Sequence, residues 1–143
     1  MLNYKFRDAT QDFDVILKTV SGVYLIAMKL RSHRDYRNDI SDAICVLMEE
    51  MESGNAISFN DIQNAYMRLY NDKLPDELME RMKQICDMSV DELKTYYEKQ
   101  NASEREIGKR IITYIDEGAN INTRNVDDVI DRIKEKMKNG NKT

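Results

Sequence analysis

The sequence predicts an all-α protein, a single compact bundle of about seven short helices. Apolar residues recur at helical spacing along most of the 143-residue chain, which holds one proline and five glycines. The stretch VYLIAM, residues 23–28, has the composition of a strand, but we find no second such stretch to pair with it. We therefore expect one helical domain over residues 1–138 and a frayed tail over 139–143.

The first helix is expected from Thr10 to Arg31. Its first half carries apolar residues at helical spacing, and its second half is apolar on nearly every side. A helix of that kind is buried on most sides, so we expect it at the centre of the bundle. Gly22 within it costs about 1 kcal/mol relative to Ala and predicts the close approach of a neighbouring helix.

The other six helices are located by their capping residues. We expect them to begin at Asn38, Ser58, Pro75, Ser89, Ser103 and either Thr123 or Asn125. The serines at 89 and 103 each precede a glutamate by three residues, which is the spacing of a capping box. Gly54 and Gly118 follow the last apolar residues of two helices and predict their ends.

Residues 40–69 and 104–133 share one pattern. Each has an amphipathic helix, a glycine stop, an isoleucine three residues later and a second amphipathic helix. We expect two similar glycine-stopped hairpins packed around the first helix. Both a true repeat and convergence on the same hairpin design remain open, because glycine-stopped amphipathic helices resemble one another by necessity.

Two known uses of a helical hairpin fit this pattern poorly. A DNA-reading helix-turn-helix needs a shorter connection than the one after Gly118, and its second helix would here begin with the acidic stretch NVDDVID. A calcium-binding EF-hand over SGNAISFND would lack both the glycine at loop position 6 and the closing glutamate.

A basic segment at residues 29–37, KLRSHRDYR, is the first candidate partner-binding site. Its candidate residues are Lys29, Arg31, His33, Arg34, Tyr36 and Arg37. Arginines interleaved with tyrosine can grip phosphates and stack a base, and the same cations suit an acidic protein surface. The alternative is a solvated helix end, where cations are favoured by the helix dipole. The net charge of −4 favours a protein over nucleic acid as the main partner.

An acidic face on the next predicted helix is the second candidate site. It consists of Asp39, Asp42, Glu49, Glu50 and Glu52, and no Lys or Arg occurs between residues 38 and 53. Such a face can meet a basic partner or mimic the phosphates of a nucleic acid. A solvated helix surface is the structural alternative.

The sequence offers little for catalysis. The glycines are dispersed and form no phosphate-binding loop, and a single histidine excludes zinc sites of the two-histidine kind. We therefore predict no catalytic residues, no metal and no cofactor, and do not expect an enzyme. A carboxylate-based metal-dependent enzyme using Glu49, Glu52 and Asp61 is the weaker alternative.

The predicted function is a non-enzymatic protein-binding module, such as an adaptor, inhibitor or immunity-type factor, acting through charged helical surfaces. The main alternative is a nucleic-acid-associated factor or regulator that uses residues 29–37. A homodimer through the apolar first helix is also open.

We predict a cytoplasmic location without membrane contact. No apolar stretch reaches the roughly 20 residues that cross a bilayer, and the acidic N-terminal residues do not resemble a signal peptide. Cys45 and Cys86 are predicted to be reduced and buried. The Asn-, Ile-, Lys- and Asp-rich composition hints at a phage or mobile-element origin.

Overall fold

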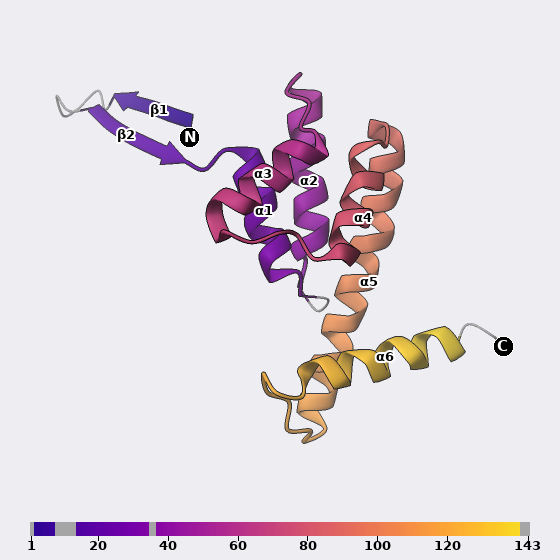
Figure 1. The fold of residues 1–143 in the computed structure, drawn as a ribbon. Helices are drawn as coiled ribbons and strands as arrows, with labels where there is room; N and C mark the ends of the chain where they lie inside the picture. Colours follow the sequence, from indigo (N-terminus) through magenta and orange to yellow (C-terminus); the bar gives the residue numbers. More distant parts are fainter. Residues whose placement is uncertain (1, 8–13, 35–36, 141–143) are drawn as a thin grey trace.

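The structure, a computed structural model, describes residues 2–7, 14–34 and 37–140 and has the predicted all-α class (Figure 1). Within these ranges the helices are α1 (Gly22–Ser32), α2 (Asp39–Glu52), α3 (Phe59–Tyr70), α4 (Asp76–Cys86), α5 (Val90–Asp116) and α6 (Val126–Gly140). There are six described helices instead of about seven, because the predicted fifth and sixth helices are one continuous helix, α5.

The predicted helices from Ser89 and Ser103 form one helix because no helix-ending residue lies between them. Ser89 forms the predicted capping box: its side chain accepts a hydrogen bond from the N–H of Glu92, whose carboxylate accepts one from the N–H of Ser89 at 2.8 Å. Ser103 has the same sequence spacing to Glu106 but lies inside α5. Residues 90–107 contain neither glycine nor proline, so nothing ends the first helix before Ser103.

A β-hairpin that was not predicted precedes the helices. Strand β1 (Leu2–Arg7) pairs antiparallel with β2 (Asp14–Thr19), and Leu2 lies opposite Thr19. The prediction of a helix from Thr10 was therefore wrong over 14–19, and residues 10–13 lie outside the described ranges. Leu2, Tyr4 and Phe6 alternate with polar residues, a pattern that predicts a strand. The prediction of a helix from Thr10 did not take this pattern into account. VYLIAM is helical, as predicted.

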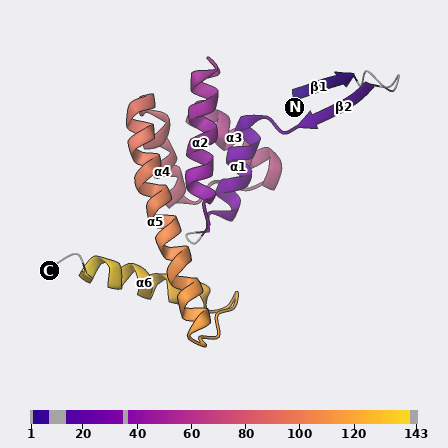
Figure 2. The same cartoon turned by 180° about the vertical axis from the view of Figure 1, so that it is seen from behind.

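The β-hairpin is set apart from the helices in both views (Figures 1 and 2). The buried residues of the main core come from α1, α2, α3, α4, α5 and the segment between α3 and α4. Helix α1 packs against α2 and α3, and α2 packs against α5. The predicted burial of the first helix is confirmed for α1, whose Ile26, Ala27 and Leu30 are fully buried. Gly22 is where α2 approaches, because a Cβ there would collide with the side chain of Glu50.

Both predicted glycine stops are confirmed. Gly54 and Gly118 have φ angles of +80° and +90°, which glycine adopts without the strain that other residues incur. Each also donates its N–H to the carbonyl three residues earlier, in Met51 and Ile115 respectively. The two helix ends therefore have the same local geometry.

The two hairpins nevertheless differ in packing. Helices α5 and α6 form a separate apolar cluster of Ile107, Ile111, Ile130 and Ile133. The second hairpin is therefore not packed around α1 as predicted, because α5 has 27 residues and extends past α2, which has 14 (Figure 2). Helix α6 also continues to Gly140, so the tail predicted from 139 begins too early, and 141–143 lie outside the described ranges.

The two cysteines are free thiols and partly buried. Burial raises the pKa of Cys86 to about 11, with smaller contributions from the negative charges of Asp87 and Asp61. Burial is also the main reason that the pKa of Cys45 is raised. Neither thiol is therefore activated as a nucleophile near neutral pH.

Candidate partner-binding surfaces

The basic segment and the acidic face, predicted as two separate surfaces, contact each other. The Nζ of Lys29 lies 2.7 Å from Oδ2 of Asp42 and 3.8 Å from Oδ1 of Asp39. Arg34 donates to Asp39 from its backbone N–H at 3.1 Å, from Nε at 2.9 Å and from Nη2 at 3.3 Å. These contacts neutralise part of both surfaces within the molecule.

Arg31 is held by α3. It donates to the hydroxyl of Tyr66 at 3.1 Å and to Asp72 at 3.4 Å, and its guanidinium carbon lies 5.1 Å from the ring centroid of Tyr70. The hydrogen bond to Tyr66 is the main reason that the pKa of Arg31 is raised. This arginine therefore fastens α1 to α3 while part of its side chain stays exposed.

The remaining candidate residues of the basic segment follow the end of α1. His33 and Arg37 are exposed, and Tyr36 lies outside the described ranges. His33 has a φ of +24° and follows the end of α1, with its Nδ1 at 2.9 Å from the carbonyl oxygen of Leu30. The structure therefore leaves these two residues as the outward-facing end of the segment.

The acidic face is also divided. Asp39 is only 3% exposed and belongs to the interior. Glu50 lies against Gly22, and Glu52 lies 3.7 Å from Lys94 of α5. Glu49 is exposed. Cations outside this helix, Lys29, Arg34 and Lys94, pair with three of its carboxylates.

Replacing Asp39 by Asn is expected to lower the free energy of unfolding by about 2 kcal/mol at pH 7. Burial alone would raise the pKa of Asp39, but the hydrogen bonds and charge of Arg34, aided by Lys29, hold this pKa below its ordinary value. A lowered folded-state pKa gives stability that is present above the unfolded-state pKa, about 3.9, and is lost as the pH falls through the folded-state pKa. Urea unfolding of both proteins from pH 7 down to pH 2 measures the effect.

The difference between wild type and the Asp39→Asn variant should shrink as the pH falls below about 4. Asp42→Asn, which removes the charge of a half-exposed partner of Lys29, is the matched control and should cost less than about 1 kcal/mol. A constant difference between wild type and Asp39→Asn over the whole pH range would contradict this account.

A buried carboxylate that the sequence analysis missed lies next to this cluster. Glu104 of α5 is 1% exposed. Its Oε1 accepts hydrogen bonds from the N–H of Ile40 at 3.2 Å and from Gln100 at 2.9 Å, and its Oε2 accepts from the N–H and hydroxyl of Ser41 at 3.3 Å and 2.6 Å. The carboxylate therefore caps the first turn of α2 from another helix, where a negative charge is favoured.

One signal in the sequence could have located Glu104. It lies three and seven residues before Ile107 and Ile111, on the face of the helix that is otherwise apolar. A charged residue in such a position is seldom buried without partners. Its partners in α2, Ile40 and Ser41, are more than 60 residues away, which no local pattern reveals.

A cleft of about 420 Å³ is lined by residues from the end of α1, the start of α2 and the N-terminal parts of α4 and α6. Its lining residues are His33, Ile40, Pro75, Glu77, Leu78, Arg81, Asp127, Ile130, Asp131 and Lys134. Arg81 donates to Gln100, which in turn donates to Glu104. The cleft wall is therefore connected to the carboxylate that caps α2, and charges of both signs face the opening.

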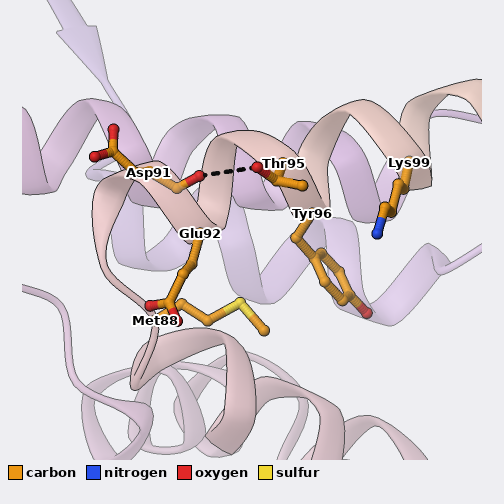
Figure 3. A pocket seen from close by; sticks show the side chains of 6 residues that line it. All are labelled: Met88, Asp91, Glu92, Thr95, Tyr96 and Lys99. Carbon is orange, nitrogen blue, oxygen red and sulfur yellow. Dashed lines mark hydrogen bonds between the residues drawn. The ribbon is translucent and has the colours of Figure 1, made fainter.

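A second hollow, of about 440 Å³, follows the start of α5 (Figure 3). Two of its polar side chains bond within the start of the helix: Glu92 bonds to Ser89, which lowers the pKa of Glu92, and the Thr95 hydroxyl donates to the carbonyl of Asp91 at 3.2 Å. The Tyr96 hydroxyl accepts from Arg81 at 2.9 Å. These contacts explain the hollow as part of the helix start.

The α5–α6 hairpin has the most exposed large apolar side chains of the described residues. Ile112 is 60% exposed and Ile115 is 50% exposed. Asn101 and Glu104, on the same face of α5, bond to Ser41 at the start of α2. Positions 101, 104, 108, 112 and 115 follow one another at spacings of three or four residues and so share one helix face. The isoleucines therefore continue the surface that α2 covers nearer the bundle.

Comparison of the chain with family models, curated proteins and solved structures finds no match. In the part of the chain that the structure describes, no helix has both the length and the apolar composition of a membrane span. Over the same ranges, no three histidine, cysteine or acidic side chains are grouped so that they could hold a metal ion.

Proposed function

We propose that this chain is a non-enzymatic protein-binding module, of the adaptor, inhibitor or immunity type, whose contact surface is the α5–α6 hairpin. The observation that carries the proposal is the pair of half-exposed isoleucines, Ile112 and Ile115, on one face of a hairpin that extends beyond the bundle. Single exposed apolar residues are ordinary, but neighbouring ones on one face are typical of contact surfaces.

The charges beside the isoleucines indicate the chemistry of the partner. Arg105 and Lys109 are exposed and precede Ile112 by seven and three residues, so they lie along the same side of α5. An apolar stripe beside cations suits a partner helix with an apolar face and neighbouring acids. The internal pairing of Lys29, Arg31 and Arg34 leaves fewer cations for a nucleic acid on the segment 29–37, which supports a protein partner.

Capture of partners from host lysate, with nuclease added to half of each sample, tests the proposal. We expect wild type to retain one protein through nuclease treatment, and the double variant Ile112→Ser and Ile115→Ser to lose it by about tenfold or more. The matched control is Met67→Ser with Leu69→Ser, which removes two exposed apolar side chains from α3 and should retain the partner.

Circular dichroism shows whether each variant remains folded, which is expected because all four side chains are exposed. Capture that disappears with nuclease would overturn the proposal in favour of the nucleic-acid alternative. Equal loss of the partner in both double variants would show that the hairpin is not its contact surface.

A further inference from the structure

The opposite flank of the hairpin contains a small pocket of about 200 Å³. The end of α5, the loop and α6 supply its lining residues, which are Tyr114, Ala119, Ile121, Val129, Arg132 and Lys136. Ligand sites for small molecules in proteins usually measure about 300–1,000 Å³. This pocket is smaller and matches the size of one large side chain.

The lining of the pocket combines aliphatic and cationic side chains. Ala119, Ile121 and Val129 provide aliphatic surface. Arg132 and Lys136 lie one helical turn apart on α6, on the flank that carries Val129. The Nζ of Lys136 donates to the Tyr114 hydroxyl at 3.0 Å and lies 5.4 Å from the centroid of that ring, so the ammonium group is held at the pocket edge.

Five charged residues of α6 line one of two openings. Asp127, Asp131 and Lys134 line the cleft toward α4, whereas Arg132 and Lys136 line the pocket. A negative ligand that approaches the pocket therefore meets the two cations and not the acids of the other flank. The pocket thus favours an anion attached to an apolar group.

We propose that this pocket is an anchor site for one large apolar side chain, such as Phe or Leu, carried by an acidic peptide segment of the partner. The inference rests on the proposed function, because it assigns the partner to the same hairpin. It uses different residues from Ile112 and Ile115, so it can fail separately.

NMR titration of the full ¹⁵N-labelled chain with a short synthetic peptide of Glu and Ala around one central Phe tests the pocket. We expect the largest shifts at the amides of Ala119, Ile121 and Val129. A peptide with Ala in place of Phe should bind about tenfold or more weakly, which corresponds to about 1.4 kcal/mol. A peptide with Lys in place of Glu should not bind, and added salt should lower the affinity for the acidic peptide.

Substitutions on α6 provide the matched test. The double variant Arg132→Gln and Lys136→Gln should lower the affinity for the acidic peptide by about tenfold. Lys138→Gln, also an exposed cation of α6, should change the affinity by less than about twofold. Ala119→Leu places extra carbons at the pocket lining and should abolish binding.

Equal binding of the Phe and Ala peptides, equal binding of the acidic and basic peptides, or shifts centred outside the pocket would each overturn the anchor site. If that occurs while lysate capture still depends on Ile112 and Ile115, the protein-binding function stands and only the pocket assignment fails. If the peptide binds at the pocket but no protein is captured from lysate, the anchor site stands and the proposed contact through Ile112 and Ile115 fails.

Discussion

Replacing Glu104 by Ala is expected to lower the free energy of unfolding by about 3 kcal/mol. The substitution leaves the N–H groups of Ile40 and Ser41 inside the protein without their acceptor. It also removes one of the two acceptors near the Ser41 hydroxyl, the other being the carbonyl of Asn38. Each buried donor that loses its partner costs about 1–3 kcal/mol, and part of this cost is recovered when water enters. Urea unfolding followed by circular dichroism measures the loss.

Two further variants separate this role from a general effect of charge. Glu106→Ala removes a half-exposed carboxylate that pairs with Arg110 at 2.7 Å on the same helix, and it should cost less than about 0.5 kcal/mol. Glu104→Gln keeps the shape of the side chain and one acceptor oxygen. Its loss in the free energy of unfolding should lie between those of Glu104→Ala and Glu106→Ala. If Glu104→Ala were no more destabilising than Glu106→Ala, the cap on α2 would have no energetic importance.

Replacing Ile133 by Ala is expected to destabilise the α5–α6 hairpin by about 2–4 kcal/mol while the main bundle remains folded. Ile133 is fully buried in the small cluster with Ile107, Ile111 and Ile130. A cluster of few residues has little surplus stability, so its loss should open α6 locally. Amide hydrogen exchange resolved by residue measures the opening of α6 and of α1 in the same sample.

Leu47→Ala is the matched control, because Leu47 is fully buried in the main core. It should speed exchange in α1, α2 and α3 by lowering global stability. Equal acceleration in α1 and α6 by Ile133→Ala would show that the two clusters unfold together, which is contrary to this prediction.

The features that the sequence predicted well are local ones. Ser58 and Ser89 begin helices, Ser89 with the predicted capping box, and Gly54 and Gly118 end helices, because each signal depends on residues within one helical turn. The helical state of VYLIAM was also predicted, since its alternative needed a second strand. The fold class followed from these elements.

The features that were missed depend on the context of distant residues. Ser103 resembles a cap but follows a helix that nothing interrupts. Asp39 and Glu104 were assigned to solvent or ignored, although both are buried by partners from other elements. The two candidate surfaces could not be recognised as each other's counterions, because charge patterns along a chain do not show which side chains meet.

The unbroken course of α5 has a consequence for insertions and deletions. Each added residue in a helix turns everything beyond it by about 100° and moves it about 1.5 Å along the axis. One extra residue between Glu104 and Ile107 would therefore swing the isoleucine stripe and the pocket about a quarter turn away from their present direction. The orientation of the hairpin is thus encoded in the number of residues in α5, and length changes near seven residues would restore it most closely.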